Sequence, residues 1–315
     1  MTLASLPCPR CGSLLAATDG VAGRAEQFED CLRRCETCGV GWSNGETAPR
    51  RIWRDPLDNV PSEVRPGLMD AITQALNVRN REMKRVKLAS DRSEDAITWT
   101  VLQYLARHTA GDAHWRLLLG CGSQPSSIPA PTILVWGVPI DGGNGKELRA
   151  AIETVLDRLG ERSASRTEPD VVLDFGEVGL VLVEVKYRSR NDRQDDKPWS
   201  RYVSEERAFA DAGAARASGR YELARNWWLG CDVAGARPLT MVNLVARPEV
   251  GAELARTEVF AGSLRLDSGR RFLRLTFSDL LSAIPIPWPS WFNAYVEERG
   301  LVSGAGVDAK ETDDG

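Results

Sequence analysis

The chain has 315 residues, of which 43% are hydrophobic, and a net charge of −4. This composition is ordinary for a folded globular protein and excludes fibrous and disordered chains, while the acidic balance means that any binding of nucleic acid must rest on local basic patches. No apolar run approaches the roughly 20 residues of a membrane helix, and the start MTLASLPCPRC lacks the pattern of a secretory signal, so we expect a cytoplasmic protein without a membrane partner.

The first predicted element is a metal-binding module near the N-terminus. The motif C-x-x-C-G occurs twice, as CPRCG and CETCG, and turns of this kind aim two thiolates at one point. The pattern resembles zinc ribbons and predicts a closed, structural Zn²⁺ site made by Cys8, Cys11, Cys35 and Cys38. Cys31 is an alternative partner for Cys35, although only Cys35 and Cys38 repeat the first pair. Such a module can contact nucleic acid, contact a partner protein or only stabilise the fold.

A linker and a basic helix are predicted next. Residues 47–61 are rich in Arg and Pro, and from Ser62 to Lys87 apolar residues recur at helical spacing. This helix ends in RNREMKRVK, in which Lys84 and Arg85 are candidate contacts for a nucleic-acid backbone. The alternative is a solvated helix face, since basic runs are common on protein surfaces.

The rest of the chain predicts an α/β domain. Its expected elements are a helix over 93–108 capped by Ser93, a strand over 131–137, a helix over 145–160, strands over 170–175 and 180–187, helices over 202–217 and 220–230, strands over 238–246 and 270–277, and a terminal helix over 291–299. Without the insertions the order is helix, strand, strand, strand, helix, strand, and the strand at 270–277 alternates like an edge strand. The predicted parts are a zinc ribbon (1–46), a linker with a basic helix (47–92), the α/β domain (93–302) and a disordered tail (303–315).

Two opposite charges interrupt the apolar strand LVLVEVK. Glu184 and Lys186 lie on one face of this strand, because residues two apart point the same way. Buried charges need a partner or a function. Hydrolysis of a phosphodiester uses a divalent cation held by carboxylates, and an ammonium beside the metal can hold the attacking water. Asp170, Glu184 and Lys186 supply such a set, and the alternative is a buried structural ion network.

These residues resemble the PD-(D/E)xK nuclease superfamily, which has the restriction-endonuclease-like fold. The motif is Pro169 and Asp170, followed by Glu184, Val185 and Lys186, and the resemblance covers about residues 93–285. It implies a mixed sheet flanked by helices, with Mg²⁺ bound by Asp170, Glu184 and the backbone carbonyl of Val185, and with Lys186 positioning the water. The superfamily often adds a glutamate from the first core helix, and Glu94 stands there; the alternative is an acid favoured by the helix dipole.

The turn between the two strands decides whether the carboxylates can meet. A three-residue turn at 176–178 pairs Asp170 with Glu184 on one face, whereas a two-residue turn pairs Asp170 with Val185 and sends the carboxylates to opposite faces. Asp174 shares the face of Asp170 but lies nearer the turn, so it is the reserve candidate.

Further basic residues are candidate contacts for the nucleic-acid backbone. Arg188 and Arg190 follow the second strand directly. The helix that carries Glu222 and Arg225 resembles the segment that flanks the site in this superfamily, so Arg225 contacts either a phosphate or Glu222.

The predicted function is therefore a Mg²⁺-dependent endonuclease that acts on DNA. By analogy with standalone nucleases, restriction or anti-phage defence is the expected setting, and cleavage of both strands would favour a homodimer. The alternative is a non-catalytic zinc-ribbon protein that binds nucleic acid or another protein on a nuclease-like scaffold.

Overall fold

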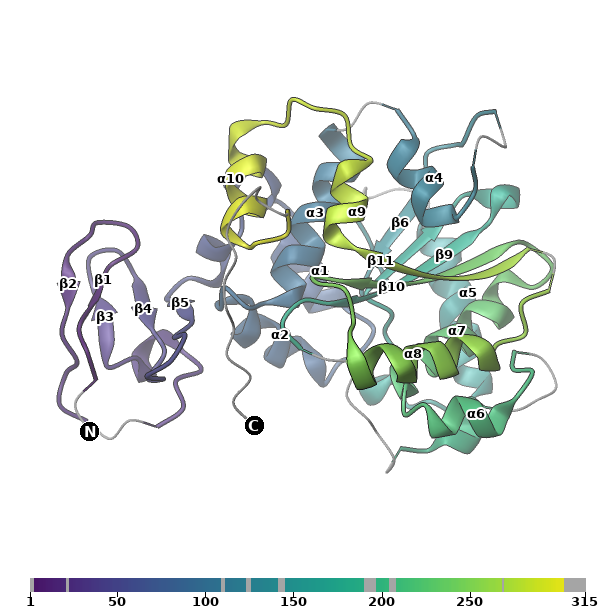
Figure 1. Ribbon diagram of the computed structural model, residues 1–315, viewed down its shortest axis with the longest axis horizontal. Helices are drawn as coiled ribbons and strands as arrows, with labels where there is room; N and C mark the ends of the chain where they lie inside the picture. Colours follow the sequence, from purple (N-terminus) through teal and green to yellow (C-terminus); the bar gives the residue numbers. More distant parts are fainter. Residues whose placement is uncertain are drawn as a thin grey trace.

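The structure is a computed structural model that describes residues 3–20, 23–108, 111–122, 126–140, 145–189, 197–203, 208–267 and 269–302. The predicted disordered tail at 303–315 lies outside the described residues, as does Arg190. A small N-terminal lobe lies beside a larger α/β body (Figure 1). No helix of the described residues combines the length and the apolar character needed to cross a bilayer.

The body is built on a mixed sheet of six strands. Their order across the sheet is β11 (Arg270–Thr276), β10 (Leu239–Val245), β9 (Leu180–Lys186), β8 (Val171–Asp174), β6 (Thr132–Val135) and β7 (Val138–Pro139). The pairs β9–β10 and β10–β11 are parallel and the others are antiparallel. The predicted edge strand is confirmed, because β11 closes one side of the sheet.

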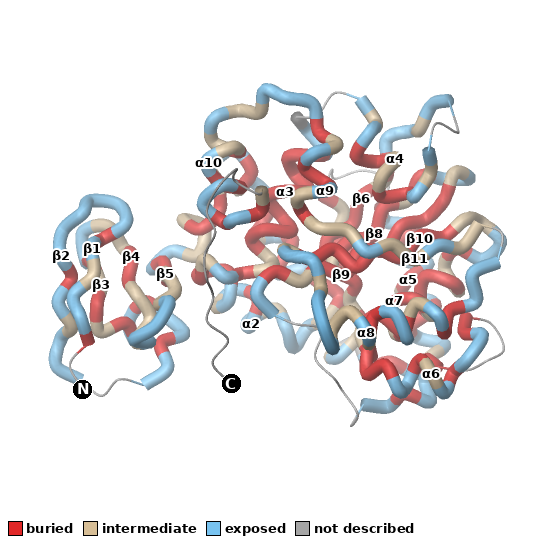
Figure 2. Tube along the Cα trace, in the orientation of Figure 1, coloured by how far each residue is buried: buried red, intermediate tan, exposed pale blue. Residues whose placement is uncertain are grey.

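Helices cover both faces of this sheet. One apolar core lies between the sheet and α3 (Glu94–His108), α4 (Ala113–Leu119), α9 (Phe277–Ser282) and α10 (Ser290–Glu298). The other lies between the sheet and α5 (Gly145–Arg158), α6 (Ala212–Ala217), α7 (Tyr221–Ala234) and α8 (Gly251–Ser263). Figure 2 shows the buried chain concentrated in the strands and the inner sides of these helices.

The predicted order of core elements is found as α3, β6, β8, β9, α7 and β10. Strand β7 and helices α4, α8 and α9 were not predicted from the sequence. Helix α8 buries only Thr257, Phe260 and Ser263, so it carries too narrow an apolar stripe to reveal a helical period.

The N-terminal lobe consists of two small antiparallel sheets. Strands β1 (Leu6–Pro7) and β2 (Leu14–Leu15) form one sheet, and β3 (Arg33–Cys35), β4 (Val40–Trp42) and β5 (Arg51–Trp53) form the other. Strand β5 lies in the segment predicted to be a linker. It also docks on the body, since the Trp53 amide donates to the Ala89 carbonyl at 2.9 Å and Arg51 forms an ion pair with Asp91 at 3.2 Å. The linker prediction is therefore wrong for these residues.

The single helix predicted over 62–87 is divided into three parts. A 3-10 turn spans Ser62–Val64, helix α1 spans Leu68–Gln74, and helix α2 spans Asn80–Leu88. Pro66 and a left-handed Gly67 separate the first two parts. Between α1 and α2 the Leu76 amide donates to the Trp136 carbonyl at 3.1 Å, so contact with the body replaces the helical hydrogen bond.

Candidate active site and zinc site

The register of β8 and β9 brings the predicted carboxylates together. Val171 lies opposite Val183 and Asp174 lies opposite Leu180. The connection is a 3-10 turn at Gly176–Val178, closed by a hydrogen bond of 2.9 Å from the Phe175 amide to the Gly179 carbonyl. This is the predicted three-residue turn. Continued by one pair, the register sets Asp170 opposite Glu184, and the two side chains leave the same face of the sheet.

The charges on β9 have partners on helix α7. The Lys186 ammonium lies 2.8 Å from Glu184 Oε1 and 2.9 Å from Glu222 Oε2. The Asn226 amide donates to Glu184 Oε2 at 2.8 Å, and both Asn226 and Glu184 are buried. Glu184 and Lys186 are therefore held in fixed positions against α7.

Asp170 is held in place just before β8. Its Oδ2 accepts a hydrogen bond of 2.8 Å from the Val185 amide. Burial raises the pKa of Asp170 well above its usual value, and the charge of Glu184 raises it further, while Lys186 and Lys84 oppose the shift. Burial also raises the pKa of Glu184, with Lys186 opposing. Without a cation, the site disfavours its own negative charges.

The ammonium of Lys186 stays protonated in this setting. Burial alone would lower the pKa of Lys186, but four nearby carboxylates together raise it: Glu184, Glu222, Asp170 and Glu94. A buried ammonium surrounded by more than one carboxylate leaves an excess of negative charge. A divalent cation would balance that excess.

The Val185 carbonyl lies beside Asp170 with no strand donor opposite it. Continued past β8, the register sets Pro169 opposite Val185, and proline has no amide hydrogen. The neighbouring Lys186 carbonyl accepts from the Ala246 amide at 2.9 Å, toward β10, so the Val185 carbonyl points toward β8. This oxygen fits the predicted role of a backbone metal ligand.

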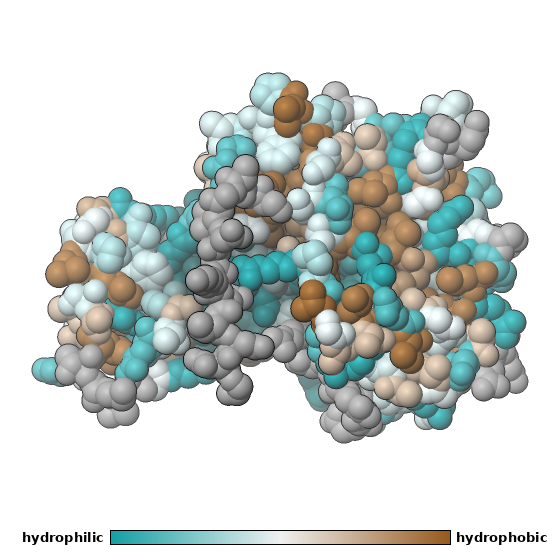
Figure 3. Space-filling model, in the orientation of Figure 1, coloured by the Kyte–Doolittle hydropathy of each residue, from teal (hydrophilic) through white to brown (hydrophobic). Residues whose placement is uncertain are grey.

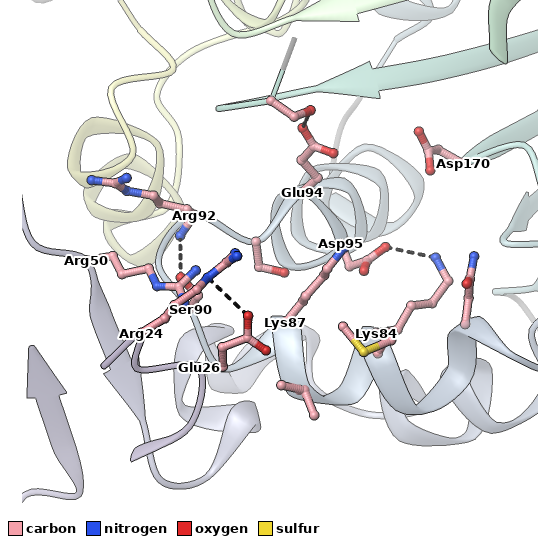
Figure 4. Close-up of a pocket in the computed structure, with 15 residues that line it drawn as sticks. Arg24, Glu26, Arg50, Lys84, Lys87, Ser90, Arg92, Glu94, Asp95 and Asp170 are labelled. Carbon is pink, nitrogen blue, oxygen red and sulfur yellow. Dashed lines mark hydrogen bonds and ion pairs between the residues drawn. The ribbon is translucent and has the colours of Figure 1, made fainter. Parts of the chain in front are cut away.

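Glu94 connects helix α3 to the end of β9. Its Oε1 accepts hydrogen bonds from the Tyr187 amide, at 2.8 Å, and from the Ser189 hydroxyl. The predicted cap is confirmed, since Ser93 accepts from the Ala96 amide at 3.2 Å. Figure 4 shows Glu94 and Asp170 in the same pocket. The side chain of Glu94 therefore reaches the site as well as standing in the first turn of its helix.

The structure corrects the expectation for Lys84. This residue was predicted to contact nucleic acid from the surface, but it is buried, and its ammonium lies 3.0 Å from both Asp95 and Glu168. It also lies 4.6 Å from the centre of the Trp136 ring. The reason is the position of α2, because the side of this helix that carries Lys84 faces the body. The charge of Lys84 is therefore paired inside the protein with Asp95 and Glu168.

The other predicted contact residues differ in their surroundings. Arg85 is exposed on α2, and Arg188 is exposed with its guanidinium 5.1 Å from the centre of the Tyr187 ring. Arg225 lies over the Tyr221 ring, at 5.8 Å, and Glu222 forms its ion pair with Lys186. The predicted alternative of an Arg225–Glu222 ion pair is not formed between these two described residues.

The four predicted cysteines converge on one point. The sulfur atoms of Cys8, Cys11, Cys35 and Cys38 all lie within 4.8 Å of one another, and those of Cys11 and Cys35 are 3.9 Å apart. A tetrahedral zinc with Zn–S bonds of about 2.3 Å places its sulfurs about 3.8 Å apart, so the set fits zinc. Cys31 does not join it, because this residue is buried beside Ala25, Ile52 and Ala89.

Within the described part of the chain, these cysteines are the only group of three or more His, Cys, Asp or Glu residues whose ligand atoms all lie within 4.8 Å of one another. The magnesium site that we predicted offers fewer side chains, namely the carboxylates of Asp170 and Glu184, together with the Val185 carbonyl. Water would complete its coordination, as is usual for Mg²⁺.

Comparisons with protein-family models, with curated proteins and with solved structures found no match for this chain.

The raised pKa of Asp170 predicts a pH-dependent effect of Asp170→Asn on the metal-free protein. The pKa of Asp170 is higher in the folded than in the unfolded state. At pH values between these two pKa values the folded state binds more protons, so the free energy of unfolding falls as the pH rises. Asparagine does not ionise, so the variant does not lose stability in this way, and its side-chain oxygen can still accept the hydrogen bond from the Val185 amide. We expect the variant to melt above the wild type at pH 8, by about 2–4 °C for each kcal/mol regained. The difference should vanish near pH ~4, where an ordinary aspartate is protonated. A constant difference across this range would contradict the assignment.

Proposed function

We propose that this protein is a Mg²⁺-dependent endonuclease that hydrolyses phosphodiester bonds of DNA. The observation that carries the proposal is the register of β8 and β9, because it sets Asp170 opposite Glu184 with Lys186 on the same face. The proposal includes the PD-(D/E)xK fold, which the order α3, β6, β8, β9, α7, β10 in a mixed sheet supports.

The residues divide the chemical work between them. Asp170, Glu184 and the Val185 carbonyl would hold Mg²⁺, which offsets negative charge on the attacking and leaving oxygens when bound. Lys186 remains an ammonium between Glu184 and Glu222, so it would donate a hydrogen bond to the attacking water and stabilise the hydroxide that forms when this water gives its proton to solvent; the leaving oxygen would take a proton from solvent in turn. Asn226 holds the second oxygen of Glu184 in place.

The excess of carboxylates supports a metal site over a purely structural ion network. A network kept only for stability balances its charges, because each unpaired buried charge costs several kcal/mol. Here the charges of four carboxylates, Asp170, Glu184, Glu222 and Glu94, act on Lys186. Arg225 also acts on Glu184 and Glu222, and the acids still outnumber these two bases. The pocket beside Asp170 also gives a substrate access to this end of the sheet.

Conversion of supercoiled plasmid tests the proposal. We expect the wild-type protein to nick or linearise plasmid with Mg²⁺ and to leave it intact without divalent ions. Linear product formed directly from supercoiled plasmid would support two sites acting together, as in a homodimer, and nicked product alone would favour a monomer. Intact plasmid under all conditions would overturn the catalytic proposal and favour the alternative, a zinc-ribbon binding protein on a nuclease-like scaffold. A role in restriction or defence is the biological part of the same proposal.

A further inference from the structure

A pocket of about 400 Å³ lies between the N-terminal lobe and the end of the sheet that carries Asp170 (Figure 4). Three parts of the chain line it: the zinc module, helix α2 with the segment after it, and the start of α3 with the ends of β8 and β9. On the face shown in Figure 3, hydrophilic residues border the junction of lobe and body. The zinc module is therefore a wall of the same pocket that Asp170 lines.

The charges in this pocket are arranged in two groups. Arg24 forms an ion pair with Glu26, and Lys84 with Asp95, at 3.1 and 3.0 Å, so these charges largely cancel. The charges that remain include three basic residues on the side of the lobe and α2, namely Arg50, Lys87 and Arg92. The acidic ones are Glu94 and Asp170, on the side of the body. A basic wall facing an acidic metal site is the arrangement that a phosphate chain requires.

The basic wall is held in place by contacts with the backbone. Arg50 donates to the Ala25 carbonyl at 2.6 Å, and Arg92 donates to the Ala48 carbonyl. A guanidinium has five donor hydrogens, so one such bond orients the group and leaves donors for a ligand. The lobe itself is joined to the segment after α2 by the Ile52–Ser90 bridge and by the hydrogen bond of 2.9 Å from the Trp53 amide to the Ala89 carbonyl.

We propose that this pocket binds the phosphodiester backbone of DNA, with Arg50, Lys87 and Arg92 contacting phosphates next to the one at the Asp170–Glu184 site. The identity of the ligand as DNA rests on the proposed function. The N-terminal lobe then acts as one wall of the substrate site, and Arg50 is its contact with the DNA backbone.

Binding of a fluorescently labelled DNA duplex, measured by anisotropy without divalent ions, tests this inference. The double variant Lys87→Gln/Arg92→Gln removes two basic groups of the wall. Arg85→Gln is the control: Arg85 is exposed on the same helix and does not line the pocket, so we assign it to the alternative of a solvated helix face rather than to a backbone contact. We expect the double variant to bind about 10–100-fold more weakly at ~100 mM salt, with a salt slope smaller by about two, since each phosphate contact contributes about one. Arg85→Gln should bind within about twofold of the wild type, as loss of net charge alone has a weak effect.

Zinc content and circular dichroism show whether each variant is folded. The inference is overturned if the double variant binds like the wild type, if Arg85→Gln weakens binding equally, or if the folded wild type binds no duplex. Its failure is separable from that of the proposed function. If the double variant binds DNA more weakly but the wild type does not cleave plasmid, the basic wall is supported and catalysis is rejected. If the wild type cleaves plasmid but the double variant binds DNA normally, catalysis is supported and the basic wall is rejected.

Discussion

Glu184→Gln is expected to lower the rate of Mg²⁺-dependent plasmid cleavage by about 10³-fold. A metal ion contributes several kcal/mol to the stabilisation of a charged transition state, and about 1.4 kcal/mol corresponds to a factor of ten. Glutamine keeps the size of the side chain but removes the charge that Mg²⁺ needs, while Lys186 keeps its ion pair with Glu222 at 2.9 Å. The rate should be measured in single turnover with saturating enzyme, so that binding does not limit it.

Asp174→Asn is the matched control for this variant. Asp174 lies on β8 and on the same face as Asp170, but it pairs with Arg237 at 2.8 Å, near the turn and away from Lys186. We expect this variant to cleave within about threefold of the wild type, provided that it remains folded, because surface ion pairs contribute little. Equal losses in Glu184→Gln and Asp174→Asn would mean that the site lies elsewhere or that stability alone is responsible.

Removal of zinc is expected to unfold the N-terminal lobe while the six-stranded sheet stays folded. Structural zinc contributes about 10–16 kcal/mol in zinc-finger peptides at neutral pH, and the small core around Cys8 and Cys35 has few other buried groups. Hydrogen exchange followed by mass spectrometry should therefore show lost protection over residues 6–42 after chelation. Protection should persist in β8, β9 and β10, whose cores do not include the lobe.

The lobe offers its own control in Cys31. This thiol is buried but does not join the four-cysteine cluster, so Cys31→Ala should retain one zinc per chain and Cys35→Ser should lose it. Retention of zinc by Cys35→Ser would show that Cys31 replaces it as a ligand. Loss of exchange protection across the whole chain after chelation would instead show that lobe and body fold as one unit.

The sequence predicted the site where short-range rules apply. The alternation of strand residues and the length of the turn after Asp174 were enough to pair Asp170 with Glu184, because each depends only on neighbouring residues. The spacing of the cysteines predicted the four-cysteine cluster for the same reason.

Features that depend on distant contacts could not be read in this way. Strand β5 forms because β4 and the residues after α2 offer it partners, and its own composition resembles a linker. The burial of Lys84 follows from Asp95 and Glu168, which come from two other segments of the chain. The pocket wall combines residues from the lobe, from α2 and from the segment before α3, so no single motif contains it.

The proline before Asp170 shows how a missing group can shape a site. Any other residue at position 169 would bring an amide hydrogen to the strand edge, where it could bond to the Val185 carbonyl and use up that oxygen. Pro169 prevents this closure because it has no amide hydrogen, and the Val185 amide donates to the Asp170 carboxylate at 2.8 Å. The pair that would end the hairpin therefore leaves a backbone oxygen without a cross-strand donor beside a carboxylate, which is where the proposed cation would bind.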